Sequence, residues 1–336
     1  QTRNIPNRRV NSRWKRRVSS QWQSTVERGL SLIKEADIAA GWVMIGDYRS
    51  QGIVVEADRD AALEAYQNAA DKGDVYALVR LAEASRDGGL MDRDPERSIG
   101  LFQRAIDAGH VSARRILGES HLRGRFGARS SPDEGLALLR QAQSLGDQSA
   151  PVTLANLYLY GTGVPKDVTR ALELLAEAAS NGNSNAAKTL ISFYRDGRGR
   201  DVPKNLSKAN AALSSSEAAF SPLDLMREKL LLSVASARSP DRISAVLDEI
   251  RAAPPVIASP IIASLRHVNA NAYVYFLQQE LRDLGIYDGP INGLLTRQTI
   301  RAVGTLCSTS KTPGQCSYGP LHSRSANAVL KLLDGI

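Results

Sequence analysis

One pattern in this chain restarts at its own end. Glycines stand at Gly73, Gly109, Gly146 and Gly182, at spacings of 36, 37 and 36 residues. An alanine follows each glycine by four residues, a leucine by eight and a second glycine by fifteen, at Ala77, Ala113, Ala150, Ala186, Leu81, Leu117, Leu154, Leu190, Gly88, Gly124, Gly161 and Gly197. With a degenerate earlier copy, about five units cover residues 37–215. Self-similarity at this period is typical of stacked helical repeats.

The spacing within a unit indicates two helices. Alanine, leucine and then tyrosine at steps of four residues share one face of a first helix, which the second glycine ends in a left-handed cap. Prolines follow, at Pro95, Pro132, Pro165 and Pro203, and proline favours the first turn of a second helix. Small residues stand near the start of that helix, at Ala62, Ser98, Gly135, Ala171 and Ala209. We expect an all-α array of stacked helical hairpins, in which the repeated residues pack and cap.

The best copy of the unit reads LANLYLYGTGVPKDVTRALELLAEAASNGN. This pattern resembles the Sel-one-like repeat family, relatives of the tetratricopeptide repeat. The resemblance implies a right-handed α-solenoid over residues 29–215, with a concave face that holds a protein or polymer partner. It implies no catalysis. Two units depart from the family, because Ser85 and His121 replace the tyrosine.

The net charge of +8 is concentrated at one end. Residues 1–28 hold eight basic side chains and one acid, so this arm carries +7. Such an arm can bind an acidic polymer or anionic lipid through charge alone, or it can be a solvated leader. No nucleic-acid-binding motif accompanies it, so we expect no nucleic-acid partner. The chain begins at Gln1 without a signal peptide, which predicts a processed piece of a longer protein.

Catalytic and metal-binding patterns are missing from the sequence. The four histidines are scattered without a ligand partner at suitable spacing, and no phosphate loop or nucleophile elbow occurs. No apolar run is long enough to span a membrane. We therefore expect no enzyme activity, no cofactor, no metal and no membrane span within the chain.

The two cysteines, Cys307 and Cys316, would close a short loop among Ser, Thr, Pro and Gly residues. A lone pair without further ligands does not make a zinc site. Two unrelated thiols are the alternative, but the spacing favours a disulfide. A disulfide in turn predicts export, to a bacterial periplasm.

The repeat fades after residue 215. Leucines and an amphipathic segment predict a helical cap over 216–252. Pro254, Pro255 and Pro260 are expected to break helical structure, which makes 253–269 a Pro-rich linker or docking segment. Ile257 and Ile261 are apolar enough to pack, so both a mobile and a docked C-terminal domain stay open.

The sequence pattern predicts a small three-helix domain over residues 270–336. Its first helix has an apolar stripe that includes Phe276, Leu277 and Leu281, with Gln278, Gln279, Arg282 and Asp283 expected outside. Thr296 is the N-cap candidate of the second helix, in which Ile300, Val303 and Leu306 should face inward. A last helix is expected over 325–333.

Between the first two helices, Gly289-Pro290 and Asn292-Gly293 force a tight turn. With Leu277, Leu281, Thr299, Ala302 and Val303, this segment resembles the three-helix peptidoglycan-binding domain of cell-wall hydrolases and periplasmic proteins. The resemblance implies a fold and a ligand, peptidoglycan or another polysaccharide. Its candidate contacts are Tyr287, Asp288, Asn292, Thr296 and Arg297, although turn and cap structure also explains Asn292 and Thr296. Asn292 departs from the family, which usually has Asp there.

The combination of repeats and this domain resembles the periplasmic part of polar-development scaffolds of the PodJ type in alphaproteobacteria. It implies a non-catalytic periplasmic scaffold, with an upstream tether to the inner membrane as one option. The array would bind a protein partner, and the C-terminal domain would contact the cell wall. The alternatives are a polysaccharide-binding or exopolysaccharide-secretion module and a module that targets a wall hydrolase.

Overall fold

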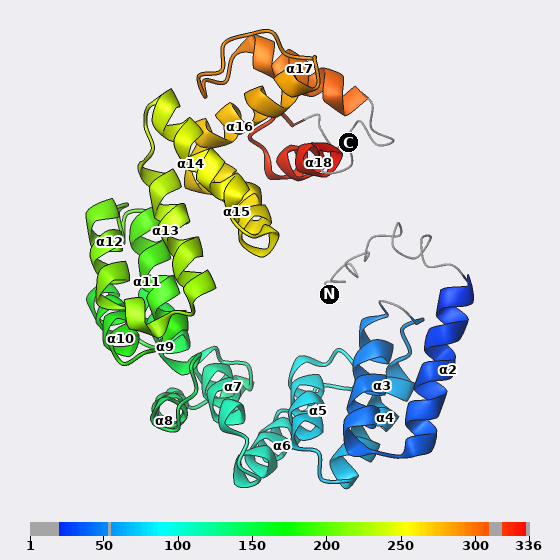
Figure 1. Cartoon of the computed structure of the whole chain (residues 1–336). Helices are drawn as coiled ribbons and strands as arrows, with labels where there is room; N and C mark the ends of the chain where they lie inside the picture. The colour runs from blue at the N-terminus through cyan, green and yellow to red at the C-terminus, as the bar shows by residue number, and fades with distance from the viewer. Residues whose placement is uncertain (1–19, 53–54, 309–317, 334–336) are drawn as a thin grey trace, which may run out of the picture. The chain divides into compact units, whose positions relative to one another are not determined.

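The computed structural model describes residues 20–52, 55–308 and 318–333, and every regular element within these ranges is helical (Figure 1). The prediction of an all-α repeat fold is confirmed. The chain divides into two compact units, residues 1–167 and 168–336. The division falls inside the repeat array, after the loop that follows Gly161.

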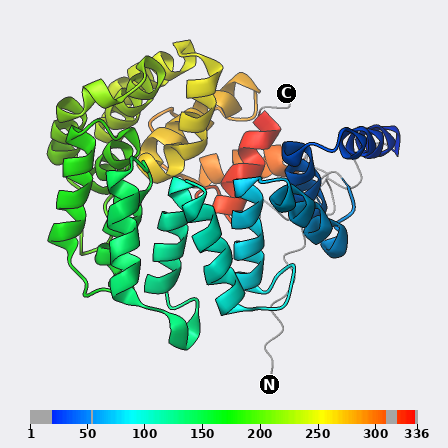
Figure 2. The same ribbon diagram turned by 90° about the horizontal axis from the view of Figure 1, so that it is seen from below.

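Unit 1 is a row of helices in which each helix packs on the next (Figures 1 and 2). Its α-helices are α2 (Ser20–Ala36), α3 (Ala39–Gln51), α4 (Arg59–Asp71), α5 (Val75–Asp87), α6 (Pro95–Asp107), α7 (Val111–Leu122), α8 (Pro132–Ser144) and α9 (Ala150–Tyr160). In Figure 2 the cyan and teal helices of this unit run side by side. We call α3, α5, α7, α9 and α11 (Ser184–Asp196, in unit 2) the A helices and their successors the B helices. The basic arm lies mostly outside the described residues, and α2 begins at Ser20.

The repeated small residues occupy the points of closest helix approach. The alanines at the four repeat positions are fully buried, and so are the small residues of the B helices. At the crossing of α7 and α8, a Cβ on Gly118 would lie 2.7 Å from the Gly135 carbonyl oxygen, and a Cβ on Gly135 would lie 2.7 Å from that of Gly118. Even alanine is too large there, so the spacing of these two helices depends on both glycines.

Four turns from a B helix to the next A helix share one glycine conformation, although α9 begins two residues later in its turn than α5, α7 and α11 do. Their glycines, at positions 73, 109, 146 and 182, all have φ of +86°. The residue that follows each glycine has a side-chain atom that accepts the N–H of the repeat alanine. Asp74, His110 and Asn183 are the N-caps of α5, α7 and α11. Asp147 makes the equivalent bond from two residues before Ser149, the N-cap of α9.

The ends of the A helices follow the prediction in part. Gly88 and Gly161 are left-handed C-caps, as expected. Gly124 instead comes one residue after the C-cap of α7, and Gly197 has ψ of 166°, outside the left-handed helical region. The longer and altered loops that follow these two glycines account for the differences.

Two of the four prolines stand where the pattern placed them. Pro95 and Pro132 open α6 and α8. Pro165 and Pro203 do not lie in a first turn, because their helices begin at Val168 and Leu206. In those units the proline comes two residues before residue 167 or 205, whose backbone N–H donates to the carbonyl of residue 158 or 194. In the second unit Asp94 makes the equivalent bond, and its proline comes directly after it.

Where tyrosine is replaced, the substitute still joins helix A to helix B. In the second unit the Ser85 hydroxyl donates to the Asp94 carbonyl, at 2.9 Å. In the third unit the loop is longer, and His121 Nδ1 accepts the Ser131 N–H at 3.0 Å. The His121 ring is 2% exposed and contacts Phe126 edge-on. Burial lowers the pKa of the His121 ring, and the Glu134 carboxylate opposes this shift. The folded structure therefore favours the neutral form of the ring.

We predict that the stability of unit 1 falls as the pH drops below about 6.5, the ordinary histidine pKa. The unfolded chain takes up the proton first, because the pKa of His121 is lowered only in the folded state. The loss is up to about 1.4 kcal/mol for each unit of pKa difference. His121→Gln should remove this part of the difference between thermal unfolding at pH 7 and pH 5. His267→Gln, at an exposed histidine, should leave this pH dependence unchanged. Equal pH profiles for the wild type and H121Q would show that His121 does not cause the loss of stability.

The part of unit 2 from α13 (Pro222–Ser236) onward has one continuous core. The α-helices of unit 2 are α10 (Val168–Ser180), α11, α12 (Leu206–Ser215), α13, α14 (Pro240–Ala252), α15 (Pro255–Val268), α16 (Ala270–Asp283), α17 (Arg297–Ser308) and α18 (Ser323–Leu333). Buried residues from Leu230 in α13 to Val329 in α18 belong to the same hydrophobic cluster. The C-terminal helices therefore share their core with α13–α15.

The expectation that prolines interrupt residues 253–269 is wrong. Helix α15 starts at Pro255 and continues through Pro260. Ile257, Ile261 and Leu265 along it are buried, so the segment is a core helix of unit 2. Burial of this apolar face outweighs the hydrogen bond that Pro260 cannot donate. Of the two arrangements that the sequence left open, the docked one is present.

Candidate functional site

The predicted ligand loop runs from Gly285 to Thr296, between α16 and α17. A buried glutamine organises it, Gln278 of α16, which is 0% exposed. The expectation that Gln278 lies outside is therefore wrong. Gln278 Oε1 accepts the backbone N–H groups of Asn292 (3.0 Å) and Gly293 (2.8 Å). Its Nε2 donates to the Leu294 carbonyl at 3.0 Å and the Thr299 hydroxyl at 3.2 Å. One side chain thus holds both the turn and the start of α17.

Three of the five candidate contacts serve this loop. Tyr287 is 4% exposed, and its hydroxyl donates to the Pro290 carbonyl at 2.9 Å. Asn292 Oδ1 accepts the Leu294 N–H at 3.0 Å, which closes a local turn. Thr296 caps α17, since its hydroxyl oxygen accepts the Thr299 N–H. Their observed contacts stabilise the loop, as the turn-and-cap interpretation predicts.

The other two candidates face solvent. Asp288 is exposed and accepts a hydrogen bond from Gln298 Nε2, at 2.8 Å, and Arg297 is exposed at the first position of α17. Exposed apolar side chains stand beside them in the sequence, Leu294 at 55% and Ile300 at 45%. The expectation that Ile300 faces inward is wrong, whereas Val303 and Leu306 are buried as predicted. The loop thus offers a carboxylate, a guanidinium and apolar groups to a ligand.

Of the two cysteines in the predicted disulfide, only Cys307 lies within the described residues. Cys307 is buried at the end of α17, and Cys316 lies outside the described residues. The disulfide stays a prediction. Within the described ranges no cluster of three or more His, Cys, Asp or Glu side chains could hold a metal ion. A search of the same ranges finds no helix long and apolar enough for a membrane span.

A second candidate surface lies on the A helices of unit 1, and sequence reasoning did not find it. Met44 and Tyr48 of α3 and Tyr76 of α5 are exposed by 46%, 37% and 40%. The Arg80 guanidinium lies 4.7 Å from the Tyr76 ring centre, and its Nε is 3.2 Å from Asp47 Oδ1 of α3. Exposed aromatic groups with an arginine are the composition of protein-binding hot spots. These positions vary from unit to unit, which is why the repeat pattern does not reveal them.

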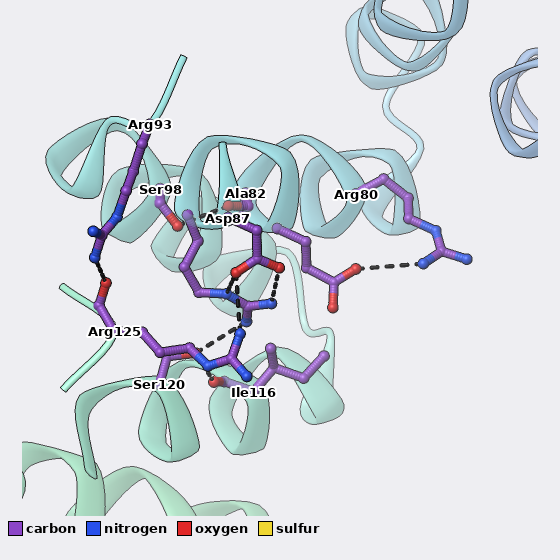
Figure 3. A network of polar contacts seen from close by, with 10 residues as sticks. Arg80, Ala82, Asp87, Arg93, Ser98, Ile116, Ser120 and Arg125 are labelled. Atoms are coloured by element: carbon purple, nitrogen blue, oxygen red, sulfur yellow. Dashed lines mark hydrogen bonds and ion pairs between the residues drawn. The ribbon is translucent and has the colours of Figure 1, made fainter. Parts of the chain in front are cut away.

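Polar contacts fix the neighbouring A helices of unit 1 to one another (Figure 3). Arg86, at the end of α5, holds the Asp87 carboxylate with two hydrogen bonds of 2.8 Å. Its third nitrogen donates to the Ser120 hydroxyl of α7, at 3.0 Å. Arg125 also reaches Asp87, at 3.1 Å, and its carbonyl accepts from Arg93 (Figure 3). We call an arginine that binds the next aspartate and the following A helix an arginine clasp.

We predict that Gln278→Met lowers the free energy of unfolding by about 3 kcal/mol, because buried N–H groups of Asn292 and Gly293 lose their acceptor. Gln279→Met, at the half-buried neighbour, should change it by less than about 0.5 kcal/mol. Urea unfolding of the full chain measures both. Equal values for the two variants would show that Gln278 does not organise the loop.

Comparison with known proteins identifies the repeat. Residues 43–74, 75–110, 111–147, 154–183 and 191–211 match the Sel1 repeat family. A Sel1 repeat protein from Oxalobacter formigenes is 24% identical, with 57% of this chain and 74% of that chain covered and a TM-score of 0.39. A protective antigen of uropathogenic Escherichia coli strains, which displays an SLR fold, is 17% identical; 90% of this chain and 66% of that chain are covered, with a TM-score of 0.41. None of the curated proteins matches the sequence.

Proposed function

Because the chain is a Sel1-repeat protein over residues 43–211, we propose that it is a non-catalytic scaffold that binds a protein partner through its A helices and peptidoglycan through its C-terminal loop. The observation that supports the first half is the repeat itself, since Sel1 repeats are typical of protein-interaction adaptors. The surface of Met44, Tyr48, Tyr76 and Arg80 supplies exposed groups suited to a partner.

The second half of the proposal rests on the exposed part of the C-terminal loop. Gln278 holds this loop in one conformation, so Asp288 and Arg297 are presented without a large ordering cost on binding. Peptidoglycan carries sugar hydroxyls, amides and charged groups of both signs, which such a pair can bind. Peptidoglycan as a ligand would place the chain in the periplasm. The resemblance of its architecture to PodJ-type scaffolds extends the proposal to a role in organising a cell pole.

We predict that a photo-crosslinker at Met44 or Tyr76 captures one discrete partner in cells, because these side chains are exposed on neighbouring A helices. The same crosslinker at Glu64, exposed on the B helix α4, is the matched control. Detection is by immunoblot of the full chain after irradiation. The absence of a defined product, or an equal product at Glu64, would remove the A-helix surface from the proposal.

We predict that the full chain sediments with purified peptidoglycan and that the double variant Asp288→Ala, Arg297→Ala reduces the bound fraction at least tenfold. Removal of the two exposed charged groups should leave the buried Gln278 contacts in place. Arg242→Ala, exposed on α14, is the control for loss of one positive charge. Wild-type chain that stays in the supernatant would exclude wall binding. Displacement by an unrelated soluble polysaccharide would favour the polysaccharide-binding alternative.

A further inference from the structure

A pocket of about 390 Å³ lies within unit 2, at the junction of α11, α13 and α15. This volume falls in the range of small-molecule sites. Three kinds of side chain line it: cations, one carboxylate and a wall of apolar and hydroxyl groups. The pocket is remote in sequence from the C-terminal loop, and no part of the proposed function uses it.

The floor of the pocket is a second arginine clasp. Arg195 of α11 binds Asp196 with two hydrogen bonds of 2.8 Å, as Arg86 binds Asp87. Its third nitrogen points to the following A-type helix, α13, and meets Glu228 at 3.4 Å. In unit 1 the corresponding partner is the hydroxyl of Ser120. A serine therefore suffices for the clasp, and the carboxylate of Glu228 is an addition specific to this pocket.

Glu228 is buried without strong partners. Its side chain is 5% exposed, and its oxygens lie 3.4 Å from Arg195 and 3.5 Å from Arg227. Charge-assisted hydrogen bonds are ordinarily about 2.7–2.9 Å long. Burial raises the pKa of Glu228, and the nearby cations Arg195, Arg227 and Lys188 only oppose that shift. A buried carboxylate in this state gains free energy from a further N–H donor.

The hydroxyl groups that line the same pocket are also acceptors. Thr189 and Ser192 of α11 donate their protons to carbonyls of their own helix, at 2.7 and 2.9 Å. Ser264 of α15 does the same, at 2.8 Å. With its proton committed, each oxygen offers the pocket only lone pairs. Glu228 and these hydroxyls together suit a protonated amine.

The opposite charge is supplied by two more exposed side chains of the lining. Lys188 and Arg227 are 26% and 32% exposed, and both contact Asp224 Oδ1, at 3.0 and 3.3 Å. An ammonium has three N–H donors and a guanidinium five, so these contacts leave donors for a ligand carboxylate. Leu231, Pro260 and Ile261 complete the lining with apolar surface.

We propose that this pocket binds a free amino acid with an aliphatic side chain. Its ammonium group contacts Glu228 and the serine and threonine oxygens, its carboxylate contacts Lys188 and Arg227, and its side chain packs on Leu231 and Ile261. The unit would then respond to a small metabolite independently of any protein or wall partner.

The test is calorimetric titration of the full chain with L-leucine, N-acetyl-L-leucine and L-leucinamide. The first has both charges, the second lacks the ammonium and the third lacks the carboxylate. We expect L-leucine to bind with a Kd of about 1 mM or tighter and each analogue to bind at least tenfold more weakly. No heat of binding with L-leucine, or equal affinity for all three probes, would overturn the proposal.

Variants assign the two ends of the ligand. Glu228→Gln should abolish the preference for L-leucine over N-acetyl-L-leucine. Arg227→Gln should abolish the preference for L-leucine over L-leucinamide. Glu228→Ser, which copies the clasp of unit 1, keeps the test valid if E228Q is unstable. Glu217→Gln, an exposed member of an ion pair with Lys229, should leave all three affinities unchanged. Retained preference for L-leucine over N-acetyl-L-leucine in a folded E228Q or E228S chain would contradict the site.

Discussion

Close approach of paired helices is the constraint on which the rest of this structure depends. Where α7 crosses α8, each glycine faces the other helix's carbonyl at a distance that admits no Cβ. At the position of Gly135 the other units have alanine or serine, namely Ala62, Ser98, Ala171 and Ala209. Because the points of contact admit only small residues, differences between units fall at positions away from these contacts. The variable, exposed positions on the A helices are therefore the places where one unit can differ from another in what it binds.

Polar side chains recur wherever the close packing leaves backbone groups without partners. Side-chain atoms of Asp74, His110, Asp147 and Asn183 each accept the N–H of the repeat alanine after a glycine with the same φ. Gln278 does the same for the C-terminal turn. The arginine clasp differs between the units in its last partner, which is a serine hydroxyl in unit 1 and a carboxylate in unit 2. The same kind of contact therefore joins neighbouring helices in unit 1 and lines a pocket in unit 2.

Much of the fold follows from local pattern, and the exceptions have physical causes. Alanine and leucine at steps of four residues indicated the buried face of each A helix. The prediction of a helix break at Pro260 was wrong, because the local rule for proline takes no account of the apolar face of α15 that tertiary packing buries. The prediction that Gln278 is exposed was wrong for a related reason. A polar residue beside an apolar stripe is expected to face solvent, and only the folded loop supplies the buried partners of Gln278.

The sequence by itself determined the helical repeat, its period and its packing residues, because these depend on spacing along one chain and on residue size. The turn residues Gly289-Pro290 and Asn292-Gly293 also located the C-terminal loop. Only the tertiary structure decided that Tyr287, Asn292 and Thr296 hold that loop while Asp288 and Arg297 face solvent. It alone brought Arg195, Glu228 and Ser264 to one pocket, since they lie on three helices. Burial and charge pairing between segments distant in sequence leave no periodic trace.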